Sequence, residues 1–118
     1  MFADLSGKVA MVTGGGQGLG LGIVLKLAGQ GADIAIADLS EENAAAAAKQ
    51  VEAMGRKAYT VKMNVTDKYS IIAGVEKITV EAGQIDILVN NAGVAGAPGS
   101  TGTGFRDVDW DFTWQVNV

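Results

Sequence analysis

Apolar runs and longer stretches of helical spacing alternate along this chain. The runs are short and rich in β-branched residues, which is typical of buried strands; they cover residues 8–13, 33–38, 57–63 and 85–90. Apolar residues at helical spacing lie between them, at residues 18–29, 41–54 and 67–82. Because such units join by right-handed crossovers, the pattern predicts an α/β fold: a Rossmann-type doubly wound parallel sheet, in part, with about four strands.

Residue types at the ends of the helical stretches predict their boundaries. Ser40 is a good N-cap, and Gly55 and Gly83 are suitable stops for the second and third helices. In the third helix one face is expected to pack on the sheet, formed by Ile71, Ile72, Val75, Ile78 and Thr79.

A glycine-rich loop joins the first predicted strand to the first helix, with the sequence Thr13-Gly14-Gly15-Gly16-Gln17-Gly18-Leu19-Gly20. Unpaired N–H groups and the positive end of the helix dipole meet there, an arrangement that binds phosphate or pyrophosphate. We expect Gly14 to turn the chain, Gly18 to let backbone approach a pyrophosphate, and Gly20 to allow close helix packing. A glycine-rich turn of any α/β protein is the alternative.

Polar residues end two other predicted strands. Asp38 ends the second strand, where a carboxylate can accept hydrogen bonds from a ribose diol. A solvated strand end or a helix N-cap is the alternative for Asp38. The fourth strand ends in Asn90-Asn91-Ala92-Gly93, and ligands of doubly wound sheets lie outside the carboxyl ends of strands.

Composition narrows the chemistry that the chain can perform. The formal net charge is −4 and no basic run occurs, so we expect no nucleic-acid partner. The sequence has neither cysteine nor histidine, which removes thiol nucleophiles and the commonest metal ligand, and no metal site is expected. Because no signal peptide and no apolar stretch of membrane-spanning length is visible, we expect a soluble, cytoplasmic protein without a membrane partner.

In combination, these motifs resemble the short-chain dehydrogenase/reductase family over about residues 5–118. The resemblance rests on the glycine loop, Asp38, Asn64-Val65-Thr66-Asp67, Asn90-Asn91-Ala92-Gly93 and Asn117. It implies an NAD(P)-dependent oxidoreductase that transfers hydride to or from a small-molecule alcohol or carbonyl substrate.

The resemblance also implies roles for single residues. The cofactor-binding positions that match are Gly14, Gln17, Gly18, Leu19, Gly20, Asp38, Leu39, Asn64, Val65, Asn90, Ala92 and Gly93. Asp38 would hold the adenosine hydroxyls, and its charge would repel a 2′-phosphate. Neither Gln17 nor Leu39 supplies a basic group, so NAD is the expected cofactor. Asn64 would accept from the adenine amine, against which Val65 would pack.

The family's catalytic Ser, Tyr and Lys have no match, and we expect them to lie beyond Val118. Asn117 alone matches a catalytic position. We therefore expect residues 1–118 to be the cofactor-binding portion of a longer enzyme, inactive alone. An exposed sheet edge and an uncovered helix face would favour a homo-oligomer.

Two alternatives to this enzyme remain. The chain could be a stand-alone module that binds NAD or an adenine nucleotide without catalysis. It could also be an S-adenosylmethionine-dependent transferase, although the acid usual before the first glycine is missing. A P-loop is excluded, because no Gly-Lys-Ser/Thr follows the glycines.

The last stretch, residues 107–118, gives conflicting signals. Polar and apolar residues alternate there without a break, which indicates a half-exposed strand. The family resemblance places the same residues in a helix that packs on the sheet. We expect the helix, with the strand gaining weight if a lone sheet edge recruits it.

Overall fold

A computed structural model describes residues 4–91 and the backbone of residues 114–116. Strands and helices alternate, in the order β1 (Val9–Thr13), α1 (Gly18–Gly29), β2 (Asp33–Asp38), α2 (Glu41–Ala53), β3 (Ala58–Lys62), α3 (Lys68–Ala82), β4 (Ile87–Asn90) and β5 (Trp114–Val116). The predicted α/β alternation is confirmed, and the boundaries of α1 and β2 agree with the prediction.

The sheet has the strand order β3-β2-β1-β4-β5, with β1 to β4 parallel to one another. Thr13 lies opposite both Ala37 in β2 and Asn90 in β4, so the carboxyl ends of these three strands are level. The chain leaves β1 toward β2 and later returns to its other side as β4. This order confirms the doubly wound Rossmann-type sheet and creates its switch point beside β1.

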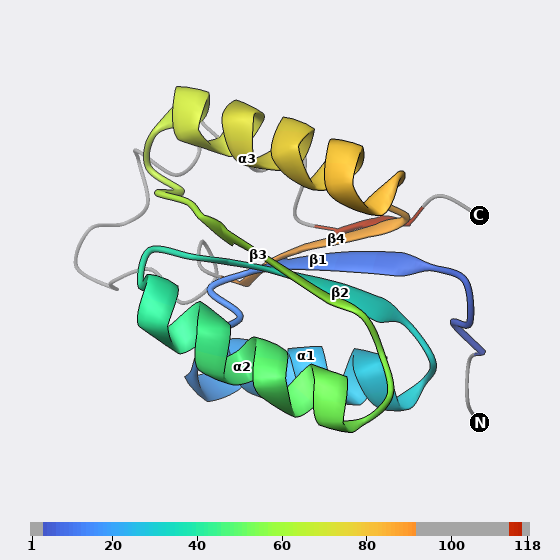
Figure 1. Cartoon of the computed structure of the whole chain (residues 1–118). Helices are drawn as coiled ribbons and strands as arrows, with labels where there is room; N and C mark the ends of the chain where they lie inside the picture. The colour runs from blue at the N-terminus through green and yellow to red at the C-terminus, as the bar shows by residue number, and fades with distance from the viewer. Residues whose placement is uncertain (1–3, 92–113, 117–118) are drawn as a thin grey trace.

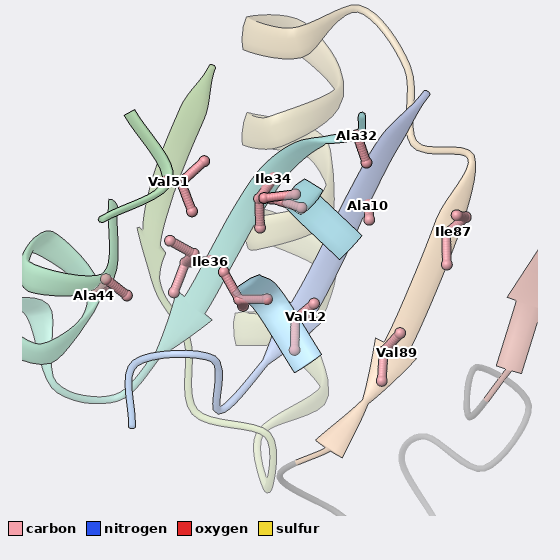
Figure 2. Packing of buried hydrophobic residues seen from close by; sticks show 12 residues of the cluster. Ala10, Val12, Ala32, Ile34, Ile36, Ala44, Val51, Ile87 and Val89 are labelled. Atoms are coloured by element: carbon pink, nitrogen blue, oxygen red, sulfur yellow. The ribbon is translucent and has the colours of Figure 1, made fainter. Parts of the chain in front are cut away.

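Helices cover both faces of the sheet. Figure 1 shows α1 and α2 below the strands and α3 above them. One core lies on the sheet face that α1 and α2 cover. It includes Val12, Ile34, Ile36 and Val89 of the strands and Val51 of α2 (Figure 2). A second cluster on the α3 face includes Met11, Met63, Ile71 and Ile78. Strand β1 is buried throughout because both of its faces are covered.

Ser40 and Gly83 form the helix ends that the sequence predicted for them. The Ser40 side chain accepts from the N–H of Asn43 and caps α2, and Asp67 caps α3 in the same way. Gly83 ends α3 in the left-handed conformation, with φ 87°. No helix of the described residues is both long and apolar enough to cross a membrane.

The predicted apolar face of α3 is partly wrong. Ile71 and Ile78 are buried, but Ile72 is 48% exposed and Thr79 is also exposed. Gly74 takes a buried place instead, and an added Cβ there would overlap the end of the Met63 side chain. A helix turns about 100° per residue, so Ile72 cannot share the sheet-facing line of Ile71 and Ile78.

The helix expected over residues 107–118 is wrong for Trp114–Val116, which form β5. This strand pairs with β4 in an antiparallel register, with Gln115 opposite Leu88. The remaining residues of that prediction lie outside the described part of the chain. The edge of β4 presents unpaired backbone groups, and an alternating segment can satisfy them by pairing there. The same pairing covers the sheet edge that was expected to be exposed.

Candidate functional site

The glycine loop connects the carboxyl end of β1 to the start of α1. Gly14 has φ 66°, and its N–H donates to the Ala37 carbonyl oxygen at 2.6 Å, which holds the start of the loop against β2. Gly18 also has a positive φ, 60°. Gln17 precedes α1 in an extended conformation without a side-chain cap. The first-turn N–H groups of α1 therefore have no side chain of Gln17 over them and remain suited to an anion.

Gly20 lies where α1 approaches the loop most closely. A Cβ added to Gly20 would overlap the Gly14 carbonyl group and lie 2.7 Å from Nδ2 of Asn91. That Asn91 amide donates to the Gly14 carbonyl oxygen at 3.4 Å. The absence of a side chain at position 20 thus allows the helix and the loop to meet, with Asn91 bridging from the end of β4.

Asp38 joins the loop to the segment that follows β2. Its Oδ2 accepts from the N–H of Gly16 and its Oδ1 accepts from the N–H of Ser40, both at 2.9 Å. The N-cap of α2 is Ser40, so the alternative role of Asp38 as a cap is wrong. A carboxylate has about four acceptor positions, so about two remain for further donors. A ribose diol presents two hydroxyl donors, which matches the remaining capacity.

Two leucines beside these polar groups are exposed. Leu19 follows Gly18 and is 66% exposed, and Leu39 follows Asp38 and is 62% exposed. Large apolar side chains exposed next to converging polar groups are typical of a ligand site. Contact of either leucine with a cofactor stays a prediction.

Asn64 and Val65 follow β3 at the same end of the sheet. The Asn64 Oδ1 accepts from the N–H of Thr66 at 3.0 Å and from its Oγ1 at 2.7 Å. The amide oxygen is therefore occupied, and it would have to release one of these bonds to accept from an adenine amine. Val65 is half-buried and lines an apolar cavity on the α3 face together with Met11 and Leu88.

Asn90 ends β4 and is buried. Its Oδ1 accepts from Oγ1 of Thr13 at 2.9 Å, which ties the carboxyl ends of β1 and β4 together. Ala92, Gly93 and Asn117, which were also predicted as site residues, lie outside the described residues.

Sequence reasoning missed two contacts of the loop. Gly16 lies directly against Asp38 and against Asn43 of α2, since an added Cβ would be 2.6 Å and 2.7 Å from their atoms. Asn43 in turn donates through Nδ2 to Oε1 of Gln17 at 3.1 Å. No motif marks Asn43, because its contact depends on how α2 returns to the loop.

The carboxyl ends of β1, β2 and β4 thus bring together a glycine loop, a helix N-terminus, a carboxylate and exposed apolar side chains. A family model described as short chain dehydrogenase matches residues 8–118. The chain belongs to the short-chain dehydrogenase/reductase family. The full-length members of this family are oxidoreductases.

Curated relatives show the same family. The chain is 51% identical to L-2,3-butanediol dehydrogenase of Corynebacterium glutamicum over 90 residues, 75% of this chain and 35% of the relative. It is 36% identical to 3-oxoacyl-[acyl-carrier-protein] reductase FabG of Thermotoga maritima over 114 residues, 97% of this chain and 46% of the relative. The chain therefore spans less than half the length of either short-chain dehydrogenase relative.

Solved structures of the family contain both nicotinamide cofactors. NAD⁺-bound xylitol dehydrogenase matches with a TM-score of 0.73 and 34% identity, covering 81% of this chain and 40% of that one. A blue fluorescent protein from a metagenomic library, in complex with NADPH, matches with a TM-score of 0.69 and 40% identity. The match covers 73% of this chain and 36% of that protein. The family thus binds nicotinamide cofactors, and its solved members include both the phosphorylated and the unphosphorylated form.

Proposed function

We propose that this chain is the NAD-binding portion of a short-chain oxidoreductase that transfers hydride between the cofactor and an alcohol or carbonyl substrate. The observation that carries the choice of NAD is the Asp38 carboxylate. It lies at the end of β2, beside the glycine loop, and backbone N–H groups hold both of its oxygens. A carboxylate fixed in this way is prepared to accept from a ribose diol.

The same carboxylate disfavours a 2′-phosphate. Two like charges about 4 Å apart repel by about 4 kcal/mol at an effective dielectric of about 20. Asp38 cannot turn aside without breaking its bonds to Gly16 and Ser40. Lys62 lies opposite Asp38 in the register of β3, but the ion pair recorded among the described residues is Lys77 with Glu81. No cation of the described residues therefore pairs with Asp38.

Calorimetric titration of the chain with NAD, and in parallel with NADP, tests this proposal. We expect saturable binding of NAD and at least tenfold weaker binding of NADP. Asp38→Asn removes the charge and keeps the size of the side chain. It should therefore weaken NAD binding and reduce the difference between the affinities for NAD and for NADP. Equal affinity of the unaltered chain for the two cofactors would contradict the proposal.

Asp33→Asn provides a matched control. Asp33 begins the strand that Asp38 ends, and its Oδ1 accepts from the N–H of Lys57 at 2.9 Å. This substitution removes one negative charge, as Asp38→Asn does, and alters a carboxylate that also accepts from a backbone N–H. It does so at the opposite end of β2 from the nucleotide site. It should leave the ratio of NAD to NADP affinity unchanged.

The alternative, a binding module without catalysis, differs in one measurable property. Neither tyrosine of the sequence is followed by lysine four residues later, the spacing expected of the family's catalytic pair. We propose that catalysis requires a longer chain, in which Asn117 would take part. Alcohol oxidation by residues 1–118 alone would contradict this division of roles. Sedimentation would test the homo-oligomer that we also propose.

A further inference from the structure

Asn43, the third residue of α2, contacts the glycine loop and its own helix cap at once. Its N–H donates to Oγ of Ser40 and its Nδ2 donates to Oε1 of Gln17, both at 3.1 Å. Its Cβ and carbonyl carbon lie 2.7 Å and 2.9 Å from where a Cβ of Gly16 would be. The first turn of α2 is therefore packed against the backbone of the loop.

The bond to Gln17 controls where that side chain lies. Gln17 is the N-cap residue of α1, yet it makes no cap bond to that helix. Its amide oxygen accepts from Asn43 of α2 instead. A glutamine free to rotate could fold over those N–H groups and compete with an anion for them.

Gly16 connects the same contact to the carboxylate. The Gly16 N–H donates to Asp38 at 2.9 Å, and the neighbouring Gln17 is tied to α2. Movement of Gln17 away from Asn43 would therefore loosen the Gly16 bond, and with it one of the two restraints on Asp38.

We propose that Asn43 is a positioning residue of the nucleotide site, which holds Gln17 aside and keeps the loop against Asp38. The inference rests on the proposed function, since it assigns Asn43 to the site that takes the pyrophosphate and ribose of NAD. Asn43 acts through Gln17 and Gly16, without contact to the cofactor.

Asn43→Ala isolates this role. The substitution removes the amide but keeps the Cβ that packs on Gly16 and the backbone N–H that Ser40 accepts. Alanine also favours a helix, so α2 should fold as before. Gln50→Ala is the matched control, because Gln50 is an exposed amide on the same helix with no recorded hydrogen bond.

Amide hydrogen exchange of the unliganded chain gives the first measurement. Loss of one exposed hydrogen bond should raise the exchange rate of the Gly16 N–H by about threefold to tenfold. The rate at Ile36, in the middle of β2, should not change. A general loss of stability would raise both rates, and unchanged exchange at Gly16 would overturn the inference.

Calorimetric titration with NAD gives the second measurement. Asn43→Ala should weaken NAD binding by about threefold to tenfold, and Gln50→Ala should leave it unchanged. In a chain that already carries Gln17→Ala, adding Asn43→Ala should cost no further affinity, because the two residues act as one unit.

The outcomes separate the two proposals. If the unaltered chain fails to bind NAD, the proposed function is contradicted, while exchange at Gly16 still decides whether Asn43 holds the loop. If NAD binds normally and Asn43→Ala has no effect on its affinity, only the positioning role is overturned. Additive losses in the double variant would also overturn it.

Discussion

Gly20→Ala should destabilise the chain sharply, although alanine is normally the better helix residue. An added Cβ would overlap the Gly14 carbonyl oxygen and lie 2.7 Å from both the Gly14 carbonyl carbon and Asn91 Nδ2. Real Cβ atoms essentially never come within 3.0 Å of a heavy atom that lies outside their own residue and its chain neighbours. Two of the three overlapping atoms belong to backbone, so rotation of a side chain cannot relieve the overlap.

The expected loss follows from two opposing terms. Replacing glycine by alanine inside a helix stabilises by about 0.5–1 kcal/mol where space is available. Overpacking costs about 1–3 kcal/mol, and more where the neighbours cannot move. Gly14 is held by its 2.6 Å bond to Ala37 and by Asn91. We therefore expect a net loss of about 2–4 kcal/mol, a large share of the ~5–15 kcal/mol typical of a domain.

Urea denaturation followed by far-ultraviolet circular dichroism measures this loss, with Gly22→Ala as the control. Gly22 lies two residues further along α1, and an added Cβ there meets nothing within 4 Å. Gly22→Ala should therefore raise the free energy of unfolding by about 0.5–1 kcal/mol. The distinctive result is that the same substitution lowers the free energy of unfolding at Gly20 and raises it at Gly22, in one helix. A Gly20→Ala chain as stable as the unaltered chain would refute the steric argument.

Two further substitutions test the helix ends by the same assay. Ser40→Ala should lower the free energy of unfolding of the chain by about 1 kcal/mol, because the N–H of Asn43 loses its cap acceptor, and an unchanged urea midpoint would contradict this role. Gly83→Ala should cost about 1–2 kcal/mol, because φ is 87° there while an added Cβ meets nothing within 4 Å. Gly29→Ala, at a helical position where the Cβ would make only an ordinary contact with Met54, should be neutral or stabilising; a loss as large as that at Gly83 would refute the conformational explanation.

The sequence alone was enough to predict the order of elements from β1 to β4 and most of their ends, to within one or two residues. Short β-branched runs form strands because a parallel sheet buries both of its faces, and the intervening helices cover those faces. Ser40 and Gly83 mark helix ends because a capping oxygen and a left-handed glycine act within a few residues of chain. These are local interactions, so the residues that form them are neighbours in the sequence.

The positions of several predicted site residues also followed from the sequence. Gly14 directly follows β1, Asp38 ends β2 and Asn90 ends β4, and a doubly wound sheet places the carboxyl ends of its central strands at one edge. Strand order therefore brings them together without any detailed packing.

Only the tertiary structure decided the exposure of Ile72 and the pairing of Trp114–Val116. Periodicity gave Ile72 a place near an apolar face, but the line of α3 that meets the sheet passes through Ile71, Gly74 and Ile78. The tail pairs with β4 because the edge of that strand offers unpaired backbone groups. The contact of Asn43 with Gln17 likewise joins residues 26 apart. Local pattern cannot specify such contacts, because they depend on which surfaces the folded sheet and helices bring together.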